Sequence, residues 1–378
     1  MKIILAPDSF KGSLTAPEAA EAMAKGVHNA LPEAEAIVVP LADGGEGTAE
    51  SLVAATNGSM IKVIVTGPLG KPVEAAYGIL GDGKTCVIEM AQASGICLIQ
   101  HNERDPLKAT TYGTGELIKS ALDKGLRKFI LAVGGSATND GGIGMLQALG
   151  MKLLDAKDKQ VRFGGEELVR IERIDDRDFD SRIADSEFLI ATDVQNPLVG
   201  ADGASHVFGP QKGATLEIAE LLDTHLTHWG NLVEKHTGIR LHNLPGAGAA
   251  GGIGGAFQAF FPSSTRRGID LVIEYAGLKD HLHDADCLFT GEGQIDFQTA
   301  SGKTPMGAAE AAKAYDIPVF AMAGSIGEGI EVLYKHGITS VHSIANGPIP
   351  LQQAIARAAE LVEHSAEQIV RTWLAYQK

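Results

Sequence analysis

The residues best suited to chemistry lie in the glycine-rich stretch GGSATNDGG, 134–142, which joins an apolar run at 129–133 to an apolar segment beginning near Ile143. A strand that feeds a glycine-rich turn at a helix N-terminus offers backbone N–H groups and a positive dipole to an anion. We therefore predict a phosphate-binding loop. Its predicted nucleotide-binding residues are Gly134, Gly135, Ser136, Thr138 and Asn139, with Asp140 as a carboxylate for a divalent metal. The alternative is a tight turn whose polar residues only cap the following helix.

Polar loops also follow the other predicted strands, where an open parallel sheet binds its ligands. The strands at 3–6, 36–40 and 287–290 are followed by PDSFKGS (7–13), ADGGEG (42–47) and TGEGQIDFQTASGKTP (290–305). A strand at 188–191 leads into TDVQNP, which contains Asp193. The candidate residues of the first three loops are Asp8, Ser9, Lys11, Ser13, Asp43, Glu46, Glu292, Asp296, Thr299 and Lys303. Phosphoryl transfer uses this mixture of metal-binding carboxylates, lysines and hydroxyl groups, although capping alone would explain any single loop.

Two further motif matches are weaker. GILGDGKT, 78–85, has the spacing of a Walker A loop, but the chain continues as a strand after it, so we predict a hairpin turn and no phosphate role for Lys84. Gly246, Gly248 and Gly251 match G-x-G-x-x-G, yet the segment before them is a poor strand that contains Pro245. We keep Gly246 and Gly248 as nucleotide-binding candidates. The alternative is that these glycines only allow close helix packing.

The elements that must position these loops indicate an α/β protein of two domains. Short apolar strands alternate with helices at both ends of the chain, which is typical of a doubly wound parallel sheet. Between them, the segments 61–66, 72–80 and 85–90 are closely spaced strands joined by glycine-containing turns, which predicts antiparallel hairpins. We predict a discontinuous flavodoxin/Rossmann-like domain formed by 1–60 and 285–378, interrupted by a mixed α/β domain at 61–284.

Three helices are predicted in detail. One covers 15–31 and is opened by the capping-box pair Thr15 and Glu18, and the others cover 215–236 and 351–376.

Composition limits the classes of partner. The net charge of −15 opposes nonspecific binding to nucleic acid or to anionic membranes, so we expect neither as a partner. Cys86, Cys97 and Cys287 lie far apart without metal-ligand spacing, which favours reduced cysteines in a cytoplasmic protein. No apolar run is long enough to span a bilayer, and the sequence leaves association into a homodimer open.

The motifs PDSFKGS, PLADGGEGT, GGSATNDGG, TDV-N-PL, GAGAAGG and TGEGQID-QT--GK-P, in this order, resemble those of the bacterial class I glycerate kinases over essentially the full chain. The resemblance implies an ATP- and Mg²⁺-dependent kinase that acts on D-glycerate in a cleft between a flavodoxin-like domain and a second α/β domain. It is most similar to the bacterial enzymes that give 2-phosphoglycerate. The position of the phosphate does not follow from the residues alone, so a 3-phosphoglycerate product stays open.

With this resemblance, Lys11 and Lys303 are expected to neutralise phosphate or the glycerate carboxylate, and Asp193 to orient the acceptor hydroxyl, so these three form the predicted catalytic set. The predicted substrate-binding residues are Ser9, Ser13, Asp43, Glu292 and Thr299, and the predicted metal ligands are Asp43, Glu46, Asp140 and Asp296. Two rivals from other classes are a nucleotide- or sugar-acid-binding protein without catalysis, and a nicotinamide dehydrogenase that uses the Gly246 loop.

Overall fold

A computed structural model describes residues 1–376 and divides the chain into two compact units. The discontinuous unit contains Met1–Gly58 and the chain from Gly268 onward, and the inserted unit is Ser59–Arg267. The segment 268–284, which the sequence assigned to the insertion, therefore lies in the discontinuous unit. Its helix α9 (Gly268–Tyr275) packs on three helices of that unit, and a Cβ on Gly268 would come within 2.1 Å of the Asp43 carbonyl oxygen.

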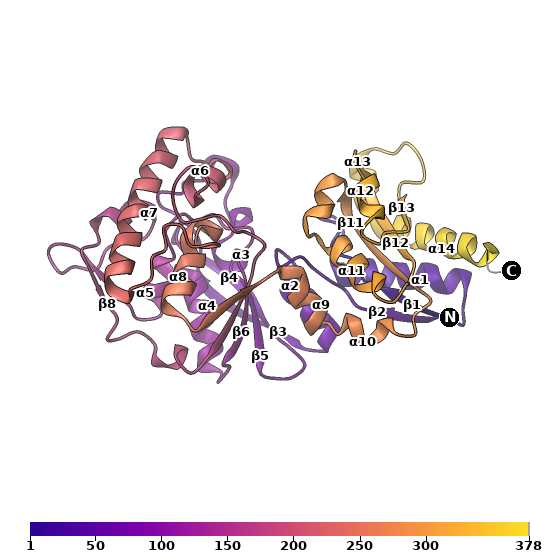
Figure 1. The fold of residues 1–378 in the computed structure, drawn as a ribbon, viewed down its shortest axis with the longest axis horizontal. Helices are drawn as coiled ribbons and strands as arrows, with labels where there is room; N and C mark the ends of the chain where they lie inside the picture. The colour runs from indigo at the N-terminus through magenta and orange to yellow at the C-terminus, as the bar shows by residue number, and fades with distance from the viewer. Residues whose placement is uncertain (377–378) are drawn as a thin grey trace. The chain divides into compact units, whose positions relative to one another are not determined.

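The discontinuous unit is built on a five-stranded, fully parallel sheet in the order β2-β1-β11-β12-β13 (Figure 1). The strand bounds are β1 Lys2–Leu5, β2 Glu35–Val38, β11 Cys287–Ile295, β12 Val319–Ile326 and β13 Ser340–Ser343. Numbered within this sheet, the order is 2-1-3-4-5, the flavodoxin-like arrangement, whose direction reverses between β1 and β11. The predicted flavodoxin-like parallel sheet is confirmed, and the reversal point is where such sheets bind ligands.

Helices cover the sheet of the discontinuous unit. Their bounds are α1 Ala16–Ala30, α2 Thr48–Thr56, α9 Gly268–Tyr275, α10 Leu278–Leu282, α11 Thr304–Lys313, α12 Glu331–Tyr334, α13 Leu351–Ala356 and α14 Ala358–Tyr376. The capping box of Thr15 and Glu18 opens α1 as predicted. Helices α1 and α14 lie against each other so closely that a Cβ on Gly26 would meet the Glu363 carbonyl oxygen at 2.1 Å. Their buried faces and the sheet form one apolar core.

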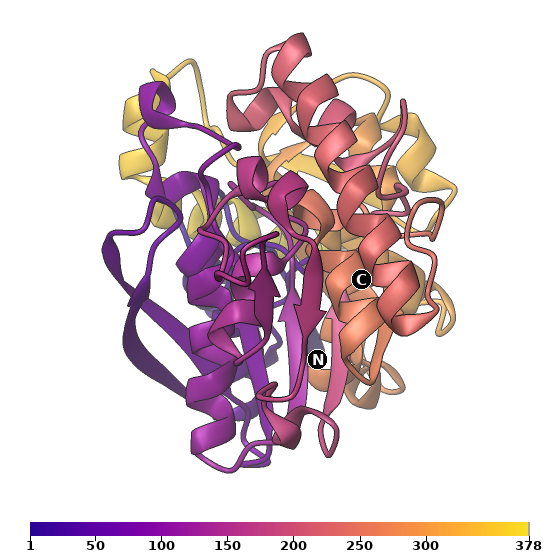
Figure 2. The same cartoon turned by 90° about the vertical axis from the view of Figure 1, so that its left-hand side faces the viewer.

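The inserted unit has a six-stranded mixed sheet in the order β10-β9-β6-β5-β4-β3. The strand bounds are β3 Ser59–Thr66, β4 Pro72–Ile79, β5 Thr85–Glu89, β6 Lys128–Ala132, β9 Glu187–Ala191 and β10 Ser263–Arg266. Strands β3, β4 and β5 are antiparallel neighbours, which confirms the predicted hairpins, and β5, β6, β9 and β10 are parallel (Figure 2). A separate antiparallel pair is formed by β7 Lys152–Leu154 and β8 Arg173–Asp175.

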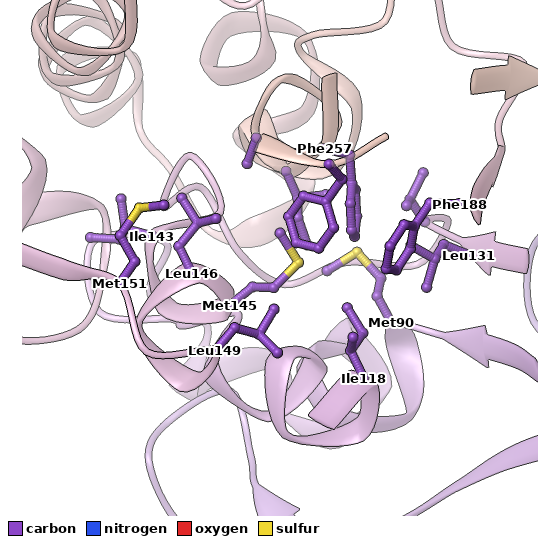
Figure 3. Packing of buried hydrophobic residues seen from close by; sticks show 14 of the residues in the cluster. Met90, Ile118, Leu131, Ile143, Met145, Leu146, Leu149, Met151, Phe188 and Phe257 are labelled. Carbon is purple, nitrogen blue, oxygen red and sulfur yellow. The ribbon is translucent and has the colours of Figure 1, made fainter. Parts of the chain in front are cut away.

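The helices of the inserted unit enclose a second apolar core. Their bounds are α3 Ala91–Ser94, α4 Tyr112–Asp123, α5 Ile143–Ala148, α6 Ala204–Phe208, α7 Leu216–Thr237 and α8 Ile253–Phe260. Figure 3 shows Ile118 of α4, Met145 of α5, Phe257 of α8 and the strand residues Leu131 and Phe188 in this core. Thr215 caps α7, the predicted long helix. No described helix of the chain is long and apolar enough to cross a membrane.

Two predicted boundaries differ from the structure. The third strand was expected to end at Thr290, but β11 continues to Ile295 because Gly291 and Glu292 stay paired with Met322 and Ala323 of β12. The predicted helix at 351–376 is two helices, because Arg357 leaves the helical conformation at φ −111° and ψ 15°.

Candidate functional site

Asp8 lies directly beyond β1 at the reversal point of the discontinuous sheet. Its backbone N–H donates to the Gly291 carbonyl oxygen of the neighbouring strand at 2.8 Å, which fixes the position of the residue. The carboxylate accepts hydrogen bonds from the Ser9 N–H at 2.6 Å and from the Thr304 hydroxyl at 2.5 Å. Burial raises the pKa of Asp8 to about 7, and repulsion from the Asp43 carboxylate adds to this rise. Asp8 can therefore exchange a proton near neutral pH.

Glu292 supplies a second buried carboxylate from β11, the strand beside β1. The Thr299 hydroxyl donates to its Oε1 at 2.8 Å, and Lys303 Nζ lies 3.6 Å from its Oε2. Burial raises the pKa of Glu292 against the lowering effects of these two partners. Thr299 is itself buried, so its hydroxyl positions Glu292 and is not presented to a ligand. The predicted residues Glu292, Thr299 and Lys303 are thus brought together, with Thr299 in a supporting role.

Lys11 and Asp43 act on this site through their charges. Neither side chain makes a direct contact with the carboxylates of Asp8 and Glu292 in the structure. The charge of Lys11 lowers the pKa of both Asp8 and Glu292, whereas the charge of Asp43 raises both. Lys11 is exposed on the turn after β1, and Asp43 is half-buried on the loop after β2. We call the group formed by Asp8, Lys11, Asp43, Glu292 and Lys303 the carboxylate–lysine site.

Four other predicted residues of this unit lie on the loops that carry the carboxylate–lysine site, and two of them, Ser13 and Asp296, have local structural roles. The Ser13 hydroxyl donates to the Phe10 carbonyl oxygen at 2.8 Å and closes a turn. Asp296 caps the short helix Phe297–Ser301, accepting from the Gln298 N–H at 2.8 Å and the Gln294 amide at 3.0 Å. Each of its oxygens accepts one hydrogen bond and keeps a further lone pair, so its role as a metal ligand stays a prediction. Ser9 is half-buried next to Asp8, and Glu46 is exposed before α2.

The loop 134–142 of the inserted unit follows β6 and precedes α5 as predicted, but most of its polar groups point inward. Gly134 and Gly135 are exposed, whereas Ser136, Thr138, Asn139 and Asp140 are buried. The loop is held by the 94–96 segment, with the Ala137 N–H donating to the Ser94 carbonyl oxygen at 2.9 Å. The exposed backbone at Gly134 and Gly135 is the part that can meet an anion. Thr138 and Asn139 belong to the interior of the loop.

Asp140 has the hydrogen bonds of a structural carboxylate. It accepts from the Thr111 N–H and hydroxyl at 2.8 and 2.9 Å, and from the N–H groups of Gly142 and Gly144 at 3.1 and 3.3 Å. Burial raises its pKa, and these four bonds act against that rise. The prediction of Asp140 as a metal ligand is not supported by this geometry, because four protein donors already occupy its two oxygens.

Lys212 is a buried cation that the sequence reasoning missed. Its ammonium donates to the Thr138 carbonyl oxygen at 2.7 Å, beneath the loop 134–142. Burial lowers the pKa of Lys212 to about 7, while the nearby Asp140 acts in the opposite direction. Within the described part of the chain, Thr138 Oγ1 and Asn139 Oδ1 are buried without a hydrogen-bond partner. The sequence around it is the turn GPQKGA, 209–214, and a single lysine in such a turn does not show whether its side chain is buried or exposed.

The glycine run after Pro245 serves close packing. A Cβ on Gly248 would lie 2.1 Å from the Pro197 carbonyl oxygen, and one on Gly251 would lie 2.0 Å from that of Thr138. The backbone of this run therefore supports the loop 134–142 from below, which favours the packing alternative for Gly248. Gly246 adopts φ +79° in the turn before it, with a nearest contact of 3.4 Å.

Asp193 lies two residues beyond β9, and its Oδ1 is 3.9 Å from Arg267 Nε. It is more exposed than Asp8 and belongs to the other unit.

The carboxylate–lysine site has the groups that phosphoryl transfer requires: a carboxylate that titrates near neutral pH, cations for anionic oxygens and further acidic oxygens for a hard cation. Among the described residues, no three His, Cys, Asp or Glu side chains form a preassembled metal site. Mg²⁺ commonly takes only one or two protein carboxylates and completes its shell with phosphate oxygens and water. Mutual repulsion between Asp43 and the carboxylates of Asp8 and Glu292 shows a surplus of negative charge that a divalent cation would relieve.

Comparison with known proteins gives a consistent result. The model of the glycerate kinase family matches residues 3–374. The glycerate kinase of Bacillus subtilis (strain 168) is 50% identical, covering 98% of this chain and 97% of that protein. The glycerate 2-kinase of Escherichia coli (strain K12) is 46% identical, covering 98% of each. The solved structure of a Salmonella typhimurium LT2 protein described as glycerate kinase 2 superposes with a TM-score of 0.90 at 47% identity, covering 100% of this chain and 99% of that one.

Proposed function

We propose that this chain, which belongs to the glycerate kinase family, transfers the γ-phosphoryl group of ATP to the O2 hydroxyl of D-glycerate and releases 2-phospho-D-glycerate. The observation that carries the proposal is the juxtaposition of buried Asp8 and Glu292 with Lys303 at the reversal point of the parallel sheet. The name of the Escherichia coli relative, glycerate 2-kinase, supports the choice of O2.

Asp8 is proposed to accept the proton of the attacking hydroxyl. A base works best when its pKa is close to the working pH, and burial raises the pKa of Asp8 to about 7. From the sequence, Asp193, whose more exposed carboxylate lies 3.9 Å from Arg267 Nε, is predicted to orient this hydroxyl. We retain Asp193 as the second candidate. Turnover of Asp193→Asn and Asp8→Asn, measured side by side, decides between the two.

Lys303 and Lys11 are proposed to bind the anionic groups of the substrates. Lys303 is anchored by Glu292, which limits its freedom and directs its charge into the site. Lys11 is exposed and can reach an incoming anion without first breaking a close ion pair. In phosphoryl transfer, cations placed in this way stabilise the charge on the equatorial phosphate oxygens.

Two carboxylates on the loop after β2 are suited to binding a magnesium ion. Asp43 is the proposed protein ligand, with Glu46 nearby on the same loop, because their carboxylate oxygens suit a hard cation. When bound with the nucleotide, the ion supplies charge neutralisation at the phosphate oxygens. The exposed backbone at Gly134 and Gly135, with the Ser136 hydroxyl beside it, is proposed to contact the phosphates of ATP.

We place the enzyme in the cytoplasm. Cys86, Cys97 and Cys287 are all free, which suits a reducing compartment where ATP is available.

The test is a coupled assay of ADP release with ATP, Mg²⁺ and D-glycerate, followed by ³¹P NMR of the product. We expect ADP release that requires D-glycerate and a product signal coupled to the proton on C2. A signal coupled to the two C3 protons would replace O2 by O3. Binding of ATP without glycerate-dependent release would contradict the kinase proposal and favour a binding protein.

A further inference from the structure

The inserted unit contains a cavity of about 750 Å³ that the residues discussed so far do not form. Its walls come from the β3–β4 turn, the segment that enters α4, the end of α5, β7 and the loop 160–166. Cavities of this size accommodate a small organic ligand such as a nucleoside. Met151, which Figure 3 shows near Ile143 and Leu146, joins the wall to the apolar core.

One wall of the cavity is aromatic. The rings of Tyr112 and Phe163 lie with their centroids 4.8 Å apart and their planes at 44°. Phe163 remains 37% exposed although it already contacts Tyr112. The nearby side chains of Met151 and Val161 are buried and extend the apolar surface. Such a surface favours a planar ring that can stack on an aromatic face.

A specific polar group, Gln147, also lines the cavity. Its amide nitrogen donates to the Val161 carbonyl oxygen at 3.0 Å. Because that carbonyl oxygen can only accept, the orientation of the amide is fixed and its Oε1 must point elsewhere. Oε1 is buried and has no hydrogen-bond partner among the described residues. A buried acceptor without a donor costs free energy, so this oxygen is suited to an N–H group of a ligand.

The rim of the cavity is positive. Lys108, Lys152 and Arg162 line it, and Glu166 is the one acidic residue of the lining. Each cation pairs with a carboxylate outside the lining, namely Asp105, Asp178 and Glu167 respectively, yet each side chain is more than half exposed. The exposed pairs of Lys108 and Lys152 are weak, so these two cations can turn to an anion, whereas Arg162 is held by the buried carboxylate of Glu167. In a chain with a net charge of −15, a cationic rim favours a ligand with a negative tail.

From these observations we infer that the cavity binds the adenine nucleoside of the phosphoryl donor, with the ring against Phe163 and Tyr112 and its exocyclic amine donating to Gln147 Oε1. This inference rests on the proposed function, because it assigns the base of the nucleotide used there. Thr111 connects the two parts of the nucleotide site, since it lies between the lining residues Thr110 and Tyr112 and holds Asp140 of the loop 134–142.

The arrangement discriminates between purines. Guanine and hypoxanthine carry a carbonyl oxygen where adenine carries its amine, so that oxygen would face Gln147 Oε1. Two acceptors cannot share a proton that neither carries, and rotating the amide would place its oxygen against the Val161 carbonyl oxygen. Gln147 is therefore a specificity-determining residue for adenine over 6-oxopurines.

The test compares ADP with IDP, which differ at this position, by isothermal titration calorimetry in the presence of Mg²⁺. We expect the wild-type protein to bind IDP about tenfold more weakly than ADP. Gln147→Met should bring the two dissociation constants together. Phe163→Ala should weaken both by about fivefold and preserve their ratio, because stacking does not depend on the 6-substituent. Phe163→Ala removes no hydrogen bond and keeps the test informative if Gln147→Met does not fold.

Tyr334→Ala is the matched control, an aromatic side chain 46% exposed on α12 of the discontinuous unit, and it should change neither constant. Equal binding of ADP and IDP by the wild-type protein, or unchanged constants in both variants, would overturn the inference. The ADP-release assay tests the proposed function separately. If ADP release depends on D-glycerate but ADP and IDP bind equally well, only the proposed adenine site is wrong. If ADP binds more tightly than IDP but no ADP is released, only the kinase proposal is wrong.

Discussion

The two large sheets of this protein carry similar polar loops and use them differently. Asp8, after β1, and Glu292, within β11, have raised pKa values although the charge of Lys11 lowers both, and Lys303 lies beside Glu292. Beyond β6, Asp140 is also a buried carboxylate near a lysine, but it accepts four hydrogen bonds, whereas Asp8 accepts two and Glu292 accepts one. A carboxylate with unsatisfied charge can do chemistry, whereas one with four donors holds a loop in shape. The number of hydrogen-bond donors around each carboxylate, and not the residue type, therefore separates the two roles.

The strongest test of this comparison is Asp8→Asn. Removing the proton acceptor should lower kcat on the order of a thousandfold, while the melting temperature changes little because the amide oxygen still accepts from the Ser9 N–H and the amide NH2 can donate to the Thr304 hydroxyl oxygen. Steady-state kinetics and a thermal melt measure the two effects. Asp284→Asn, an exposed carboxylate of the same unit paired with Lys2, is the control. A kcat within tenfold of the wild type would remove Asp8 from the chemistry.

Asp140→Asn should have the opposite profile. The amide nitrogen would face a backbone N–H, so at least one donor loses its acceptor, and we expect the free energy of unfolding to fall by about 2–3 kcal/mol. Urea denaturation gives this value. Asp158→Asn, which alters an exposed ion pair with Arg173, should change stability by less than about 0.5 kcal/mol. An unchanged stability for Asp140→Asn would contradict its structural assignment.

Lys303→Met should raise the KM for glycerate by about tenfold or more, because the neutral side chain leaves Glu292 without its cation and the substrate anion without a partner. Lys303→Arg keeps the charge and should recover part of the loss. The exposed Lys25 on α1 provides the control substitution Lys25→Met. If Lys303→Met changes only thermal stability, its pairing with Glu292 is structural.

The rate of the wild-type enzyme should depend on pH through Asp8. Asp8 accepts a proton only as the carboxylate, and burial raises its pKa to about 7, so kcat/KM should fall about tenfold per pH unit below that value and level off above it. In the Asp8→Asn variant, the remaining kcat/KM should no longer fall as the pH is lowered below this value. A fall that persists unchanged in the variant assigns the titration to another group.

The smallest effect is expected at Lys84. It is exposed beside a hairpin turn in which Asp82 accepts from the N–H groups of Lys84 and Thr85 at 2.8 Å each. Lys84→Ala should therefore leave the dissociation constant of ADP unchanged, as a titration of variant and wild type would show. A large loss of affinity would revive the Walker A interpretation.

The sequence predicts the fold of this protein better than its site. Alternating apolar runs identify the parallel strands, and the glycine turns identify the hairpin of β3 and β4, because burial and turn conformation leave a local pattern. The extension of β11 to Ile295 escapes prediction, since Gly291 and Gly293 look like loop residues until β12 lies beside them. The roles of Asp140, Asp296 and Lys212 depend on donors and acceptors that are distant in sequence or hidden in turns.

The sheet order of the discontinuous unit also constrains how the protein is made. β11 lies between β1 and β12, yet 209 residues, Ser59–Arg267, are synthesised between the first two strands and the return of the chain to this unit. At typical elongation rates this takes roughly 10 to 40 seconds. During that time the inserted unit emerges whole, while β1 keeps an unpaired edge where β11 will join. The inserted unit can therefore fold before the parallel sheet is complete, and until β11 is made the unpaired edge of β1 is open to pairing with another chain.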